Sequence, residues 1–66
     1  MENLRNNILK VLRTDQAFTV PEIAFALLAY QDVVQRTLHE LDDQGLVSMR
    51  NGLYRKSQKA IQEDKT

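Results

Sequence analysis

The sequence has no cysteine, and it has only one histidine and one proline among its 66 residues. Without cysteine the chain cannot form disulfide bonds or thiolate metal sites, and a single histidine does not make a zinc site. The chain also has no apolar run long enough to span a membrane and no signal-peptide pattern. We therefore expect a cytoplasmic protein with no membrane partner, no metal and no cofactor.

The residues that enzymes use for catalysis are equally scarce. Ser48 and Ser57 have no general base at a recognisable spacing, and the two glycines, Gly45 and Gly52, stand alone instead of forming a phosphate-binding loop. Both glycines also fit structural roles at the ends of elements. The sequence therefore predicts no catalytic residue and a protein that is not an enzyme.

The charges balance to a formal net charge of zero, with nine basic and nine acidic residues. This balance disfavours nucleic-acid binding, because proteins that bind nucleic acid are usually basic. The charges are unevenly placed, however, because every charged side chain between residues 48 and 59 is basic: Arg50, Arg55, Lys56 and Lys59. Such a patch fits contact with phosphate groups, and the alternative is charge that discourages edge-to-edge strand pairing.

A chain of this length is expected to form one domain with a small core, and apolar spacing predicts its first two helices. Residues 3–13 are predicted to be the first helix, with Asn3 as its cap. Its apolar stripe comprises Leu4, Ile8, Val11 and Leu12. Residues 14–18 are predicted to be a connector. The second helix starts at residues 19–22, where the sequence Thr-Val-Pro-Glu fits a capping box with proline in the first turn.

The third helix is predicted over residues 31–44. Its apolar stripe comprises Val34, Leu38 and Leu41. Gly45 ends this helix, because the position after a helix usually needs a positive φ, which glycine adopts without steric strain.

A β-hairpin follows the third helix. Asn51-Gly52 is the strongest short-range hairpin signal, since a two-residue type I′ turn needs a positive φ at both central positions. Strands are therefore expected near residues 46–50 and 53–56. Residues 57–66 are polar and are predicted to be a frayed tail or one weak helical turn.

Four segments, taken in order, carry a resemblance to a known family. They are Thr-Val-Pro-Glu-Ile-Ala at residues 19–24, the stripe of Val34, Leu38 and Leu41, Gly45-Leu46-Val47, and Asn51-Gly52. In this order they resemble the winged helix-turn-helix superfamily, as in small bacterial transcriptional regulators of the ArsR and MarR kind. The resemblance implies an α+β fold with three helices and then a two-stranded β-hairpin wing in residues 1–56. Residues 57–66 would then be a polar C-terminal tail.

The resemblance also implies a function, which is binding of double-stranded DNA by a small transcriptional regulator. The third helix would enter the major groove and the wing would contact the DNA backbone. The groove-facing residues implied by position are Gln31, Asp32, Val33, Gln35, Arg36 and His39. The wing contacts would come from Arg50, Asn51 and Arg55, with Lys56 in the same basic stretch. Arg36 could read guanine, Gln35 could read adenine, and the Tyr30 hydroxyl could donate to a phosphate.

The sequence departs from the family at the turn between the second and third helices. The family often has glycine in this turn and serine or threonine as the next helix cap, whereas Leu28 and Tyr30 stand at these places here. The metal sites of ArsR-type sensors have no counterpart, so metal sensing is not implied.

Other interpretations of the same residues remain open. Asp32, Arg36 and Glu40 are spaced to form a charge ladder along one solvated helix face. The same fold also serves as a protein–protein interaction module, which the zero net charge favours, or as a structural subunit of a larger assembly. A homodimer is the usual solution for a small DNA reader, and here Leu9, Phe25 and the tail are the candidate contacts.

Overall fold

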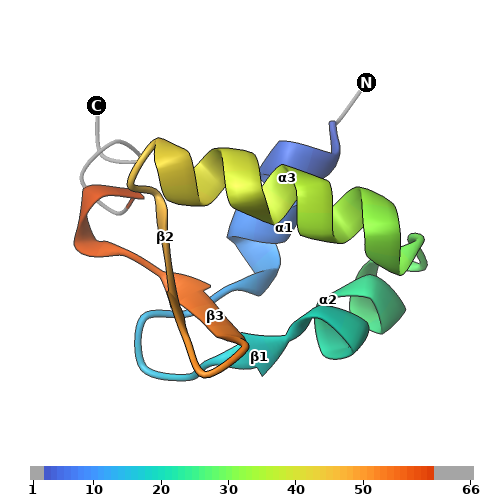
Figure 1. The fold of residues 1–66 in the computed structure, drawn as a ribbon, viewed down its shortest axis with the longest axis horizontal. Coiled ribbons are helices and arrows are strands. Elements are labelled where there is room, and N and C mark those ends of the chain that lie inside the picture. The colour runs from blue at the N-terminus through green and yellow to red at the C-terminus, as the bar shows by residue number, and fades with distance from the viewer. Residues whose placement is uncertain (1–2, 61–66) are drawn as a thin grey trace.

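The computed structural model describes residues 3–60, which form helices and three short antiparallel strands. The elements are α1 (Leu4–Val11), β1 (Phe18–Thr19), α2 (Val20–Leu27), α3 (Gln31–Asp43), β2 (Val47–Arg50) and β3 (Leu53–Lys56). Residues 58–60 are helical again. The three strands form one antiparallel sheet, and α3 lies across the molecule above it (Figure 1). The predicted α+β class is therefore confirmed.

The sheet has one strand more than the sequence predicts. Its order is β1-β3-β2, with Phe18 opposite Tyr54 and Thr19 opposite Leu53. The prediction of a connector through Phe18 is wrong here, whereas the predicted two-stranded hairpin is present as β2 and β3 and gains β1 as a third strand. A strand of two residues has no alternating pattern to read, and its pairing partner lies far along the chain.

The cap of α1 is confirmed, because the Asn3 side chain accepts a hydrogen bond of 2.9 Å from the Asn6 N–H. The helix ends at Val11, two residues earlier than predicted. Leu12 takes an extended conformation, with φ −71° and ψ 148°, and its side chain is buried in the core. Burial of this leucine therefore continues the apolar stripe after the helix itself has stopped.

The start of α2 is fixed by the predicted capping box. The Thr19 hydroxyl accepts from the Glu22 N–H at 3.3 Å, and the Glu22 carboxylate accepts from the Thr19 N–H at 2.8 Å. These bonds satisfy two backbone N–H groups at the start of the helix, where no preceding turn supplies a carbonyl acceptor. The backbone hydrogen bond from Thr19, followed by that from its hydroxyl, lowers the pKa of Glu22 below its ordinary value of 4.5.

The helices α2 and α3 end in the same hydrogen-bonded motif, with a left-handed residue directly after α2 and one residue later after α3. At the end of α3, Gly45 has φ 77° and the Leu46 N–H donates to the Leu41 carbonyl at 2.9 Å. At the end of α2, Leu28 has φ 53° and the Ala29 N–H donates to the Ala24 carbonyl at 2.9 Å. Both are Schellman motifs, but only the first has the glycine that tolerates this conformation without strain.

The core is assembled around α3, whose predicted apolar stripe is fully buried. Val34, Leu38 and Leu41 are all 0% exposed. They pack with buried residues of α1, α2, the sheet and the chain after it: Ile8, Leu12, Ile23, Ala24, Leu46, Val47, Tyr54 and Ala60. In α2, Ile23 and Ala24 are buried, and Val20 and Leu27 pack partly against the same core.

The first residues of the predicted tail pack onto the end of α3. Ala60 is only 4% exposed, and the Ser57 hydroxyl donates to the Gly45 carbonyl. The Lys59 ammonium donates to the Gln44 carbonyl at 2.9 Å, where a cation stabilises the negative end of the helix. Lys59 therefore has a structural role. Residues 61–66, the rest of the predicted tail, lie outside the described residues.

Substitutions at Leu28 and Gly45, the left-handed residues at the two helix ends, should change stability in opposite directions. We expect Leu28→Gly to raise the free energy of unfolding by about 0.5–1 kcal/mol, because relief of left-handed strain exceeds the added freedom of the unfolded chain. Gly45→Ala should lower it by about 1 kcal/mol at an equivalent φ. Urea unfolding monitored by circular dichroism measures both, and a destabilised Leu28→Gly variant would contradict the strain assigned to Leu28.

The capping box predicts a pH dependence of stability. Because folding lowers the pKa of Glu22, its contribution is fully present above the unfolded pKa and is lost as the pH falls through the folded pKa. The free energy of unfolding should therefore decline as the pH falls below 4.5, the ordinary pKa of this carboxyl group. Urea titrations of the wild type and of Glu22→Gln should show a smaller decline in the variant. Identical pH slopes would show that Glu22 contributes nothing.

Candidate nucleic-acid interface

The exposed face of α3 carries the predicted groove-facing residues. Burial of the apolar stripe turns Gln31, Gln35, Arg36 and His39 to solvent, and all four are exposed. The Asp32 carboxylate accepts from the Val33 N–H at 2.9 Å and thereby caps the first turn of its own helix. Among the described residues, Arg36 makes no hydrogen bond or ion pair, so the charge ladder from Asp32 to Glu40 does not form.

The two halves of α3 differ in charge. The first half offers Arg36 and neutral amides, whereas the second half carries Glu40, Asp42 and Asp43, all exposed. These carboxylates lie near the negative end of the helix and would repel phosphate groups. Any contact between α3 and an anionic polymer must therefore use its N-terminal half, up to about His39.

The tip of the hairpin has the predicted geometry. Asn51 and Gly52 have φ values of 55° and 78°, and the strands pair directly across them, with Arg50 opposite Leu53. The register then divides the side chains between two faces. Val47 and Tyr54 lie on the inner face and are buried, so the outer face carries Ser48, Arg50, Leu53 and Arg55.

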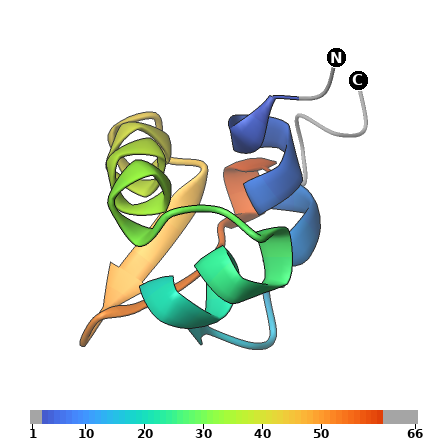
Figure 2. The ribbon, with the colours of Figure 1, turned by 90° about the vertical axis from the view of Figure 1, so that its right-hand side faces the viewer.

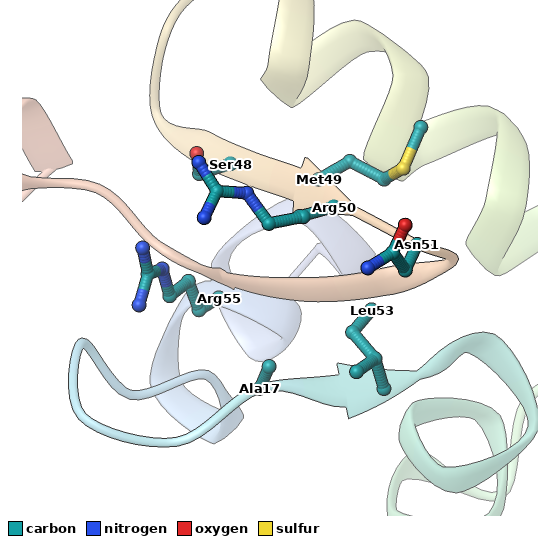
Figure 3. A pocket seen from close by; sticks show the side chains of 7 residues that line it. All are labelled: Ala17, Ser48, Met49, Arg50, Asn51, Leu53 and Arg55. Atoms are coloured by element: carbon teal, nitrogen blue, oxygen red, sulfur yellow. The ribbon is translucent and has the colours of Figure 1, made fainter.

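The outer face of the hairpin contains a hollow of about 240 Å³. Its lining comprises Ala17, Ser48, Met49, Arg50, Asn51, Leu53 and Arg55, with no acidic side chain (Figure 3). The guanidinium groups of Arg50 and Arg55 lie on the same side of the hairpin (Figure 3). Within residues 3–60 neither guanidinium makes a hydrogen bond or ion pair. The hollow therefore presents two exposed guanidinium groups to an anionic ligand.

Lys56 starts from the opposite face of the sheet to these arginines, although it borders a second hollow together with Ser48 and Arg55. It pairs with Val47, so its side chain starts from the inner face of the sheet. It is half-buried and lines a separate hollow with Asn6, Leu9 and Lys10 of α1. The strand register alternates side chains between faces, so Lys56 and Arg55 start from opposite faces of the sheet although they are adjacent in the sequence.

Arg36 and the hairpin arginines are likewise in separate places. Arg36 projects from α3, and Arg50 and Arg55 project from the sheet face opposite to the one that packs on the helices. Met49, on the inner face and half exposed, extends toward the α3 side of the hairpin (Figure 3). The arginines therefore occupy two separate places, one on the exposed face of α3 and one on the outer face of the hairpin.

The turn between α2 and α3 exposes large apolar side chains, of which sequence analysis named Phe25 as a candidate contact and missed the exposure of Leu28. Leu28 is 91% exposed, and Phe25 and Tyr30 are each 81% exposed. Tyr30 caps α3 with its backbone only, and its side chain makes no cap hydrogen bond. The available signal was leucine in a turn where the backbone needs a glycine-like conformation. Leu9, the other predicted contact residue, instead packs partly against the core.

Comparisons of the chain with protein-family models, curated proteins and solved structures find no match. None of the helices in residues 3–60 has the length and apolarity that a membrane crossing requires. Over the same range, histidine, aspartate and glutamate form no group of three or more that could hold a metal ion. The functional argument therefore rests on the geometry and charge of the α3 face, the hairpin and the turn.

Proposed function

We propose that this chain is a winged helix-turn-helix domain that binds double-stranded DNA and regulates transcription. The first half of α3 would enter the major groove, and the β2–β3 hairpin would contact the DNA backbone as the wing. The element order supports this proposal, because a helix, a tight turn, a second helix and a hairpin follow one another in that architecture.

One observation about the basic residues carries the proposal. The basic residues of the described chain with a structural partner are Arg5, Lys10, Arg13, Lys56 and Lys59. Arg36, Arg50 and Arg55 have no partner within the described residues, and they occur at the positions where the resemblance implies DNA contacts. A partnered arginine would lose an existing bond on binding a phosphate, whereas these three would not.

Each of the proposed contacts has a distinct chemical role. Arg36 can donate two hydrogen bonds to guanine, and Gln35 can make the equivalent pair with adenine. Arg50, Asn51 and Arg55 would donate to phosphates. The hydroxyl of Tyr30 and the imidazole of His39 would add contacts at the two ends of the α3 segment. No cofactor takes part in this mechanism.

A second candidate function is a protein–protein interaction module without DNA binding. The exposed Phe25, Leu28 and Tyr30 favour it, because monomeric proteins seldom expose large apolar side chains side by side. The acidic second half of α3 also favours it. The two candidates differ in salt dependence, because only DNA binding by arginine releases counterions from the duplex.

The salt dependence of duplex binding is the central test. We expect Arg50→Ala and Arg55→Ala each to reduce the slope of log affinity against log salt by about one unit, equally for all sequences. Arg36→Ala should weaken a preferred site by about 1–3 kcal/mol relative to random duplex, because a base contact discriminates between sequences. Fluorescence anisotropy with labelled duplexes at several salt concentrations measures both effects.

Lys10→Gln is the matched control for these titrations. It removes one positive charge from α1, which packs against the buried face of α3 and not against the exposed face that carries Arg36 (Figure 2). Its salt slope should equal that of the wild type. A lack of duplex binding at low salt by protein that circular dichroism shows to be folded would reject the DNA proposal and favour the protein-interaction module.

A further inference from the structure

The turn between α2 and α3 forms an apolar surface, defined by Phe25, Leu28, Tyr30 and Val33 and called here the apolar turn. Their exposed fractions are 81%, 91%, 81% and 41%. Phe25 and Leu28 are three residues apart at the end of α2, and Tyr30 and Val33 are three apart at the start of α3. All four residues lie in or next to the connection between α2 and α3, whose backbone faces the viewer in Figure 2.

The apolar turn is held rigidly in its exposed position. The Leu28 N–H donates to the Phe25 carbonyl at 3.2 Å, and the next N–H donates to the Ala24 carbonyl at 2.9 Å. The following residue, Ala29, packs partly against the core. These contacts fix the backbone of the turn, so the exposure of its side chains is a property of the folded chain.

Leu28 is unfavourable at this position for two independent reasons. Its backbone has φ 53°, where glycine is favoured, and its side chain has almost no contact with the rest of the chain. Neither the conformation nor the side chain stabilises the monomer. Strain of this kind at an exposed residue points to a role outside the isolated fold.

We infer that a second copy of this chain covers the apolar turn. From Ile23 to Val33 the chain has one charged residue, Asp32, whose carboxylate accepts from the Val33 N–H at 2.9 Å, and the formal net charge of the chain is zero. Two copies therefore approach without net charge repulsion, and the four side chains that define the apolar turn are themselves uncharged. An isologous contact places the same surface on both sides, so apolar side chains meet apolar side chains.

The area of the apolar turn agrees with a weak dimer. Phe25 and Tyr30, at their exposed fractions, offer together about 250–400 Å² of surface. A stable interface needs about 800 Å² per partner, so the two aromatic side chains would supply roughly a third to a half of it. Leu28 and Val33 add to this apolar centre. The contact should accordingly form at micromolar to millimolar concentration and not more tightly.

A dimer through the apolar turn excludes DNA reading by α3; this second step rests on the proposed function. Tyr30 and Gln31 start α3 and belong to the proposed DNA contacts, so the partner copy would cover them. The first turns of both α3 helices would also meet at the two-fold axis. A dimer that reads a palindrome instead holds its recognition helices about 34 Å apart. Self-association therefore competes with duplex binding.

Sedimentation velocity from about 1 µM to about 1 mM tests the self-association. We expect a reversible dimer whose dissociation constant rises at least about tenfold in Phe25→Ser and in Leu28→Gly. Leu28→Gly suits the backbone of the turn, so weaker association in that variant cannot be attributed to unfolding. Raising the salt concentration should not weaken the dimer, since the contact is apolar.

Met49→Thr is the matched control, because it removes another exposed apolar side chain at a distance from the turn. Its dissociation constant should equal that of the wild type. A wild type that stays monomeric over the whole range overturns the inference, and so does a dimer that the Phe25 and Leu28 variants leave unchanged.

Adding a short duplex at low salt tests the competition. Because mutually exclusive equilibria are reciprocal, the duplex should convert the wild-type dimer into complexes with one protein chain. Duplex that binds the intact dimer, or strengthens it, overturns the competition. If the monomeric Phe25→Ser variant binds no duplex, the proposed function and the competition fail together. The sedimentation series still decides the self-association by itself.

Discussion

Burial of the apolar stripe of α3 is the interaction on which the rest of the structure depends. The helix contacts α1, α2 and β2, and its three stripe residues are completely covered. Loss of a fully buried leucine such as Leu38 would remove contacts with several elements at once. Because one face of α3 is fixed inward, the opposite face with Arg36 is fixed outward. The candidate interface is thus a consequence of core packing.

The two Schellman motifs set the limits of α3 and also place the two surfaces beside it. At the C-terminal end, Gly45 lets the chain turn directly into β2, and Leu46 enters the core. At the end of α2, the equivalent turn brings the chain to the start of α3 and leaves Leu28 in solvent. The same backbone geometry thus produces a stable junction with glycine and a strained, exposed junction with leucine.

Electrostatics explain how a neutral chain can still be proposed to bind DNA. Lys59 stabilises the carbonyl end of α3, and Arg5 donates to Gln44, so part of the positive charge is used within the fold. The three arginines without a partner in the described chain stand at two separate positions on α3 and the hairpin. Such a distribution favours a few directed contacts over a broad attraction to phosphate. The uncharged apolar turn beside α3 offers a way to limit those contacts through self-association.

Local sequence signals predicted the elements whose hydrogen bonds are local. The capping box of Thr19 and Glu22 needs only residues three apart. The turn at Asn51 and Gly52 needs only a pair that accepts positive φ. The stripe of α3 follows from helical spacing alone. For the same reason the exposed face of α3, and with it Arg36, could be predicted without the structure.

The tertiary structure alone decided the features that depend on distant partners. Strand β1 exists because β3 pairs with it, and two residues give no pattern that announces this. Arg55 and Lys56 are adjacent in the sequence but start from opposite faces of the sheet, because β3 pairs with β2 in a register that sets Lys56 opposite Val47. Lys59 stabilises the end of α3 because its ammonium group donates to the carbonyl of Gln44, fifteen residues earlier in the sequence. Sequence determined which segments could form helices and turns, whereas pairing and packing between distant segments decided which side chains share a face, because those contacts exist only in the folded chain.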